Sequence, residues 1–266
     1  MTKLTDRVAI VTGAQRGIGA GIAKILAEYG AQVILTDVSN AVTRIAEELS
    51  RADLRATAFK MDVTDSNEVN KVVDQVLSQF GRIDILVNNA GIYPRCELVN
   101  MTDEFLRKMF DVNVFGMFRC TRAALPAMMK QRYGKIVNVS SVTGPMVADP
   151  IGGQTSYAAT KAAVQGFTTA LALEVAQYGI NVNAICPGHI DTPGGREQTT
   201  ETVFPDKSLE ELGGTVPVGR LGTPEEVGAL VAFLVSDESR YMTGTHIVID
   251  GGNIIQETYR GPYSRK

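Results

Sequence analysis

The chain alternates short apolar runs with longer amphipathic segments, and this alternation constrains the fold more than any other feature. The apolar runs have the length of strands and are bounded by turn residues, whereas the segments between them have helical periodicity. Runs this rich in Val, Ile and Leu suit strands that are buried on both faces, as in a parallel sheet. The strand-like runs are residues 8–12, 32–36, 56–60, 83–88, 135–140, 181–184 and 246–249, and the main helical segments are residues 18–29, 41–50, 66–79, 103–130, 156–177 and 224–234.

This order predicts an α/β fold, a single Rossmann-type doubly wound parallel sheet with helices on both faces. No repeat or linker divides the 266 residues, so residues 1–252 are expected to form one domain. Residues 188–217 depart from the pattern, and so long a connection inside a domain is typical of a lid or a poorly ordered segment. Residues 253–266 form a C-terminal tail, either loosely packed or in contact with another subunit.

The composition excludes several classes of protein. Lys and Arg total 26 against 29 Asp and Glu, a formal net charge of −3 that gives no reason to expect nucleic-acid binding. No run approaches the ~18 apolar residues of a membrane span, and the N-terminus lacks the apolar core of a signal peptide. Cys96, Cys120 and Cys186 have neither disulfide-scaffold nor metal-ligand spacing. We therefore expect a soluble, cytoplasmic protein without a metal site, a membrane anchor or a nucleic-acid partner.

A glycine-rich turn follows the first strand and opens the first helical segment. It reads Thr-Gly-Ala-Gln-Arg-Gly-Ile-Gly, with Gly-x3-Gly-x-Gly spacing. Glycines there let the backbone turn tightly and let a pyrophosphate approach the free N–H groups and the positive end of the helix. A merely tight turn is the alternative interpretation. The residues expected to bind a dinucleotide at this turn are Gly13, Gln15, Arg16, Gly17, Ile18 and Gly19.

Asp37 ends the second strand, 18 residues after Gly19. A carboxylate at this place accepts hydrogen bonds from the adenine-ribose hydroxyls and repels a 2′-phosphate, which favours NAD(H) over NADP(H). Arg16 could instead pair with that phosphate. Like charges in a half-buried pocket repel by several kcal/mol, whereas a flexible arginine can turn to solvent. NAD(H) is therefore the favoured cofactor, and NADP(H) is the alternative.

Two further strand ends carry polar or small residues at the edge where ligands of open α/β sheets bind. After the third strand come Asp62 and Val63, and Asp62 could hold the adenine amino group or simply cap a turn. The fourth strand ends in Asn-Asn-Ala-Gly, where small residues let the backbone close over the cofactor and the amides can tie adjacent loops together. Asn89, Ala90 and Gly91 are thus expected at the cofactor, with a plain polar turn as the alternative.

Tyr157 and Lys161 lie four residues apart at the start of a helical segment, so they share one face. A phenol with a pKa near 10 is a poor base at neutral pH, but an adjacent ammonium lowers that pKa toward the working range. A Tyr-x3-Lys pair by itself is most often a surface pair. The polar residues predicted nearby favour a catalytic role here.

Ser141 follows a buried strand at the ligand edge, where its hydroxyl can hydrogen-bond a substrate oxygen. We favour it over Ser140, which strand alternation directs to the opposite face. Asn113 interrupts the long helical segment 103–130, where an amide can compete with the backbone ladder and hold a water beside Lys161. An ordinary core amide is the alternative for Asn113.

Taken together, these motifs resemble those of the short-chain dehydrogenase/reductase family. The glycine turn, Asn-Asn-Ala-Gly, Asn113, Ser141, Tyr157-x3-Lys161 and Pro187-Gly188 occur in the family's order, and the resemblance covers about residues 5–252. Phrases such as Ser-Ser-Val-Thr-Gly and Asn-Ala-Ile-Cys-Pro-Gly are similar to those of bacterial 3-oxoacyl-carrier-protein reductases, sugar-alcohol dehydrogenases and a group of enterobacterial oxidoreductases.

The resemblance implies roles for individual residues. Tyr157 would be the general acid/base, Lys161 would lower its pKa and hold the nicotinamide ribose, Ser141 would position the substrate oxygen, and Asn113 would anchor a proton-relay water. The nicotinamide end would be held by Pro187, Gly188, Ile190 and Thr192. The family also suggests a homotetramer, and the apolar side chains Phe110, Phe115, Phe118 and Phe167 independently favour self-association.

One departure from the family concerns the substrate side. Ser141 and Tyr157 are 16 positions apart, a longer spacing than in many members. The loop between them contains Asp149 and Gln154, which we interpret as candidate substrate residues, with a solvated loop as the alternative. His189 is a further candidate, and Arg95 and Arg196 are weaker ones. A polar pocket of this kind suits a small hydroxylated substrate better than a steroid.

The sequence thus predicts an NAD(H)-dependent enzyme that acts on CH–OH groups and interconverts a small secondary alcohol and a ketone. The substrate class expected is a polyol, a sugar or another hydroxy compound. One alternative is an NADPH-dependent 3-oxoacyl-thioester reductase, against which Asp37 argues. A more distant alternative is a non-catalytic redox sensor that binds dinucleotide, but such proteins tend to lose the tyrosine or the lysine.

Overall fold

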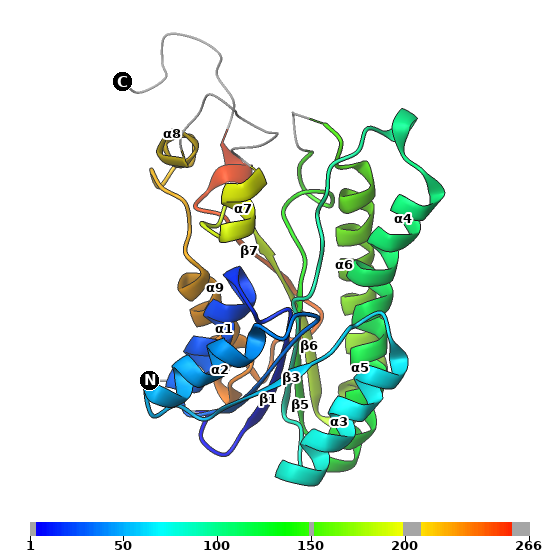
Figure 1. Cartoon of the computed structure of the whole chain (residues 1–266), viewed down its shortest axis with the longest axis vertical. Helices are drawn as coiled ribbons and strands as arrows, with labels where there is room; N and C mark the ends of the chain where they lie inside the picture. Colours follow the sequence, from blue (N-terminus) through cyan, green and yellow to red (C-terminus); the bar gives the residue numbers. More distant parts are fainter. Residues whose placement is uncertain (1–3, 149–151, 199–208, 257–266) are drawn as a thin grey trace.

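Seven parallel strands form one sheet in the order β3-β2-β1-β4-β5-β6-β7 (Figure 1). The computed structural model describes residues 4–148, 152–198 and 209–256. The strands are β1 (Val8–Thr12), β2 (Gln32–Asp37), β3 (Ala56–Lys60), β4 (Ile85–Asn88), β5 (Gly134–Val139), β6 (Ile180–Pro187) and β7 (His246–Ile249). Because the order reverses between β1 and β4, crossovers pass over both faces of the sheet. The predicted doubly wound fold is confirmed.

Helices cover both faces of this sheet (Figure 1). On one face lie α1 (Gly17–Glu28), α2 (Val42–Arg51) and α9 (Pro224–Leu234); on the other lie α3 (Ser66–Phe80), α4 (Asp103–Phe110), α5 (Gly116–Gln131) and α6 (Thr155–Val175). Successive side chains of a strand enter opposite cores: Ala9 and Val11 of β1 pack with α1, α2 and α9, while Val8 and Ile10 pack with α3, α5 and α6.

Local sequence signals explain where several helices begin and end. Asp65 caps α3 by accepting hydrogen bonds from the N–H groups of Asn67 and Glu68, and Gly81 ends the helix in a left-handed conformation at φ 74°. Thr223 and Glu226 form a reciprocal capping box at the start of α9. These capping interactions fix where α3 and α9 begin and where α3 ends.

The predicted helix over residues 103–130 differs from the structure in its middle. It consists of α4, a π-helical segment η2 (Asp111–Phe115) and α5, with Asn113 inside the π-helical segment. A π turn inserts one residue into the helical ladder and is frequent at functional sites. The interruption that Asn113 predicted is therefore present as a change of helix type.

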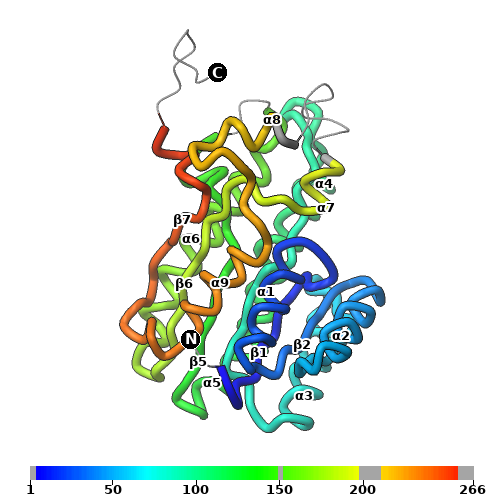
Figure 2. Tube along the Cα trace, turned by 90° about the vertical axis from the view of Figure 1, so that its left-hand side faces the viewer, coloured from blue at the N-terminus to red at the C-terminus, as the bar shows by residue number. Residues whose placement is uncertain are grey.

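Short helices lie above the carboxyl edge of the sheet. The described parts of the segment 188–217 contain α7 (Pro193–Gln198) and α8 (Leu209–Gly214), which lie near each other at the same end of the molecule (Figure 2). Single turns of 3-10 helix, η1 (Leu98–Asn100), η3 (Ala176–Tyr178), η5 (Asp237–Ser239) and η6 (Asn253–Ile255), complete the described chain. Among the described helices, none is long and apolar enough to cross a membrane.

Candidate active site

A cleft of about 1950 Å³ runs along the carboxyl ends of the strands. Its position is that of the ligand sites of open α/β sheets. All residues predicted to bind the cofactor line this cleft, namely Gly13, Gln15, Arg16, Gly17, Ile18, Gly19, Asp37, Asp62, Val63, Asn89, Ala90, Gly91, Tyr157, Lys161, Pro187, Gly188, Ile190 and Thr192.

The glycine-rich turn leaves its backbone open to the cleft. Gly13 adopts φ 64°, and a Cβ on it would lie 2.8 Å from Ala90 Cα, closer than side chains pack. A Cβ on Gly19 would collide with the carbonyl oxygen of Gly13. The turn therefore admits only glycine at these two positions, and it leads directly into the N-terminus of α1. This cradle fits the pyrophosphate of a dinucleotide.

Asn89 ties the end of β4 to this turn. Its side-chain Nδ2 donates to the carbonyl oxygens of Thr12 and Gly13, both at 2.9 Å. In return, Thr12 Oγ1 accepts from the backbone N–H groups of Asn89 and Ala90, both at 3.0 Å. The two loops are thus held as one unit beside the cleft.

Asp37 and Asp62 both line the cleft, but their carboxylates are engaged differently. Asp37 accepts from the backbone N–H of Gln15 at 3.2 Å and from that of Ser39 at 3.0 Å, which fixes it beside the glycine-rich turn. Asp62 Oδ1 accepts from the N–H and the hydroxyl of Thr64 at 2.8 and 2.7 Å. Asp62 therefore makes the contacts expected of a residue that caps a turn. It also lines the cleft, as contact with an adenine amino group would require.

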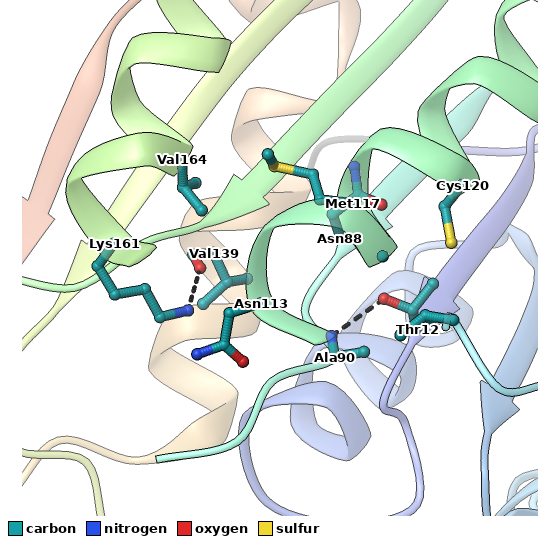
Figure 3. A pocket seen from close by; sticks show the side chains of 11 residues that line it. Thr12, Asn88, Ala90, Asn113, Met117, Cys120, Val139, Lys161 and Val164 are labelled. Carbon is teal, nitrogen blue, oxygen red and sulfur yellow. Dashed lines mark hydrogen bonds between the residues drawn. The ribbon is translucent and has the colours of Figure 1, made fainter. Parts of the chain in front are cut away.

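Tyr157 and Lys161 lie at the cleft in the first two turns of α6. Lys161 is buried, and its Nζ donates to the carbonyl oxygen of Val139 at 2.8 Å (Figure 3). The same nitrogen lies 5.5 Å from the centre of the Tyr157 ring. Tyr157 and Ser141 form a hydrogen bond. The two neighbouring serines diverge, because the Ser140 hydroxyl donates to the carbonyl oxygen of Lys161 at 2.9 Å.

Burial is the largest influence on the pKa of both groups. It raises the pKa of Tyr157 to about 12, while the hydrogen bond with Ser141 acts in the opposite direction. Burial also lowers the pKa of Lys161 to about 8. The expectation that Lys161 brings the tyrosine pKa down toward neutrality is therefore wrong. The physical reason is that desolvation of the phenolate is the largest influence on this pKa and outweighs the hydrogen bond with Ser141.

Asn113 is buried and is held by backbone and side-chain partners. Its Oδ1 accepts from the N–H of Ile92 at 2.8 Å, and its Nδ2 donates to the carbonyl oxygen of Ile92 at 2.8 Å and to Thr160 Oγ1 at 3.2 Å. It lies between Lys161 and Ala90 at a small cavity of about 10 Å³ (Figure 3). Such a volume suits one water molecule. Asn88 Oδ1, also at this cavity, is buried without a hydrogen-bond partner among the described residues.

The candidate substrate residues are only partly brought together. Ser141, Gln154 and His189 line the cleft, as does Arg95, whose Nη1 donates to the carbonyl oxygen of Gly152 at 2.6 Å. Asp149 lies outside the described residues. Arg196 forms a two-point ion pair with Asp191, at 2.7 Å for each contact, and is not among the residues that line the cleft.

The sequence did not predict the contacts that Tyr93 and Glu197 make at the cleft. Tyr93 packs edge-on against Tyr157, with ring centroids 6.5 Å apart, and its hydroxyl lies against Gly194 of α7. Glu197, also in α7, pairs with Arg16. No local signal marks either residue, because each contact joins segments far apart in the chain. Among the described residues, no cluster of three or more His, Cys, Asp or Glu side chains could hold a metal.

Comparison with known proteins shows which family the sequence matches. A family model described as enoyl-(acyl carrier protein) reductase matches residues 13–253. Oxidoreductase UcpA of Salmonella typhimurium is 46% identical over 260 residues, 97% of this chain and 98% of the relative, in agreement with the predicted resemblance to enterobacterial oxidoreductases. The 3-oxoacyl-[acyl-carrier-protein] reductase FabG of Thermotoga maritima is 42% identical over 95% of this chain and 100% of its own length.

Solved structures extend the likeness to three dimensions. The crystal structure of gox2181 has a TM-score of 0.89 and 37% sequence identity, and the match covers 96% of this chain and 98% of that one. A crystal structure described as a putative gluconate dehydrogenase from Agrobacterium tumefaciens has a TM-score of 0.88 and 31% identity, with 95% and 97% of the two chains covered.

Proposed function

Because the chain belongs to the short-chain dehydrogenase/reductase family, we propose that it transfers hydride between NAD(H) and a small secondary alcohol or ketone. The observation that carries the proposal is the convergence of Tyr157, Ser141 and Lys161 at one cleft with a glycine-rich dinucleotide cradle. The bound nicotinamide would supply the hydride chemistry, and the residues of the chain would position the substrate and move one proton.

Ser141 and Tyr157 would act together on the substrate oxygen. Their mutual hydrogen bond places two hydroxyl groups at one point of the cleft, where a carbonyl oxygen can accept from both. With its pKa near 12, Tyr157 is protonated at neutral pH and is ready to donate its proton as a ketone becomes an alkoxide. In the reverse direction, the same tyrosine would receive the proton of the alcohol.

Lys161 and Asn113 would help to return a proton to Tyr157 after it has donated its own. The charged amine stabilises the phenolate that proton donation leaves behind, across the 5.5 Å between Nζ and the ring centre. The cavity beside Asn113 suits one water, which could pass a proton toward Lys161. Asn113 would be a positioning residue, because its own side chain is fully engaged with Ile92 and Thr160.

The preference for NAD(H) rests on Asp37. Its carboxylate is fixed next to the glycine-rich turn, where it would accept hydrogen bonds from ribose hydroxyls and repel a 2′-phosphate. Pro187, Gly188, Ile190 and Thr192 also line the cleft, where they would hold the nicotinamide.

A polyol, a sugar or another small hydroxy compound is the proposed substrate. The polar residues Gln154 and His189 line the same cleft as Tyr157, and one structural relative is described as a putative gluconate dehydrogenase. The second candidate is NADPH-dependent reduction of a 3-oxoacyl thioester. Arg16 in the glycine-rich turn and the 42% identity with a FabG reductase favour it.

The proposal includes a cytoplasmic homotetramer built from one catalytic domain, residues 1–252, with a lid over about residues 188–217 and a C-terminal tail. Phe115 and Phe118 on the α5 side of the molecule are about half exposed, and Phe118 packs on Phe167 with ring centroids 4.4 Å apart. Apolar surface of this kind favours association of copies. Sedimentation should show a tetramer at micromolar concentration, and a monomer would contradict it.

The decisive experiment is a panel of polyols, sugars, ketones and a 3-oxoacyl thioester, each assayed by nicotinamide absorbance with NAD(H) and NADP(H) in parallel. The proposal expects turnover of a small alcohol or ketone with NAD(H). Turnover of the thioester with NADPH alone would select the second candidate. Binding of dinucleotide without turnover of any compound would favour the sensor.

A further inference from the structure

Arg16, the cation of the glycine-rich turn, is paired with Glu197 of α7. Its Nη1 lies 2.6 Å from Glu197 Oε1, although the two residues are 181 positions apart. The side chains are 49% and 56% exposed, and both residues line the cleft. The pair thus bridges the dinucleotide cradle and α7 across the opening of the site.

A second carboxylate acts on the same guanidinium. Asp37 accepts from the N–H of Gln15, the residue that precedes Arg16, so it lies beside the same turn. The pKa of Arg16 is raised chiefly by the hydrogen bond with Glu197, and the charges of Glu197, Tyr93 and Asp37 add to this. The guanidinium of Arg16 is therefore within the electrostatic influence of both Glu197 and Asp37.

We propose that Glu197 is a coenzyme-selecting residue, which occupies Arg16 and so withdraws the cation that the 2′-phosphate of NADP(H) would need. The inference rests on the proposed dinucleotide-dependent function and deepens it. A phosphate at Arg16 would compete with the carboxylate of Glu197 for the guanidinium, and it would lie close to the negative charges of Glu197 and Asp37. The two hydroxyls of an NAD(H) ribose have no such competition, because they need only Asp37.

The test measures coenzyme binding rather than activity. Isothermal titration of NADH and NADPH, without substrate, is made on the wild type, Glu197→Gln, Arg16→Met and the double variant. Glu197→Gln should lower the Kd for NADPH about twofold to fivefold, the range of an exposed ion pair, and change that for NADH less than twofold. The gain should disappear in the double variant, and Arg16→Met alone should change NADPH affinity little, since Arg16 is already occupied.

A matched control separates coenzyme selection from a general loosening of α7. Asp191→Asn breaks a different ion pair, which joins Asp191 to Arg196 of α7, and it leaves the Arg16–Glu197 pair in place. It should leave the NADPH-to-NADH ratio of Kd values unchanged. The inference is overturned if Glu197→Gln leaves that ratio at the wild-type value, if the gain persists without Arg16, or if Asp191→Asn produces the same gain. Absence of any dinucleotide binding would overturn the proposed function together with the inference.

Discussion

The Nζ of Lys161 lies 5.5 Å from the centre of the Tyr157 ring and hydrogen-bonds the carbonyl oxygen of Val139 rather than the phenol. The four-residue spacing in α6 brings both groups to one face of the helix, and β5 supplies the acceptor that anchors the amine. The lysine is therefore held as a nearby charge and leaves the tyrosine hydroxyl to Ser141 and the substrate. In the proposed mechanism, Tyr157 would donate the proton, and Lys161 would stabilise the resulting phenolate through its charge.

Replacing Tyr157 by Phe should abolish turnover while sparing dinucleotide binding. The change removes only the hydroxyl that donates the proton, so kcat should fall by about 10²–10⁴-fold. The Kd for NADH, measured by titration, should change by less than about threefold. The matched control is Tyr178→Phe, at the far end of the same helical stretch, which should retain wild-type kcat. Full turnover by Tyr157→Phe would remove this tyrosine from the mechanism.

Ketone reduction should slow as pH rises through about 8. Burial lowers the pKa of Lys161 to about 8, so its positive charge is present below this value and lost above it. Without that charge, the phenolate that forms on Tyr157 is stabilised less. The value of kcat/KM for the ketone, measured from pH 6 to 10 at saturating NADH, should show an apparent pKa near 8. NADH binding is titrated at each pH as a control, and a flat profile to pH 10 would contradict the assignment.

Local pattern was sufficient to predict the elements and most of the cleft. Asp37 and the glycine-rich turn could be placed because each follows directly from a strand, and parallel strands bring their carboxyl ends to one edge. Ser141 could be preferred over Ser140 because alternation along a strand is a local rule; in the structure the Ser140 hydroxyl donates to the carbonyl oxygen of Lys161, and both serines line the cleft.

Long-range packing and burial could not be predicted in the same way. The pairing of Arg16 with Glu197 depends on how α7 packs beside the glycine-rich turn, and nothing near either residue encodes it. The pKa of Tyr157 depends on how deeply α6 packs, so the sequence predicted a lowering where burial produces a rise to about 12. The spacing of two residues on a helix fixes their proximity but not the polarity of their surroundings.

Lys161 should make stability depend on pH between about 8 and 10.5. Its pKa is about 8 in the folded state against 10.5 in the unfolded chain, so the unfolded state binds more protons in this window and the free energy of unfolding rises with pH. The rise amounts to about 3 kcal/mol at most. Urea unfolding of wild type and Lys161→Met, at one protein concentration, should diverge by this increment across the window. Parallel curves would show that the buried lysine keeps an ordinary pKa.

Removing the charge of Asp37 should relax coenzyme selection. Asp37→Asn keeps the shape of the side chain but loses the repulsion toward a 2′-phosphate, so the ratio of the NADPH and NADH Kd values should shift toward NADPH by about tenfold, equivalent to ~1.4 kcal/mol. Asp62→Asn changes another carboxylate of the same cleft and should affect both dinucleotides alike. An unaltered ratio in Asp37→Asn would mean that Asp37 does not face the ribose phosphate position.

The glycine-rich turn should fail when Gly19 becomes alanine, whereas another helical glycine should tolerate the same change. A Cβ on Gly19 meets the carbonyl oxygen of Gly13, so the turn must shift by backbone movement; we expect NADH affinity to be lost and the free energy of unfolding to fall by about 1–3 kcal/mol. Gly166 in α6 is exposed, and a Cβ there has nothing within 4 Å. Gly166→Ala should therefore keep NADH affinity and gain up to about 1 kcal/mol, because alanine favours a helix over glycine. Thermal unfolding and NADH titration of both variants measure the contrast, and unchanged NADH binding in Gly19→Ala would show that the pyrophosphate does not depend on this cradle.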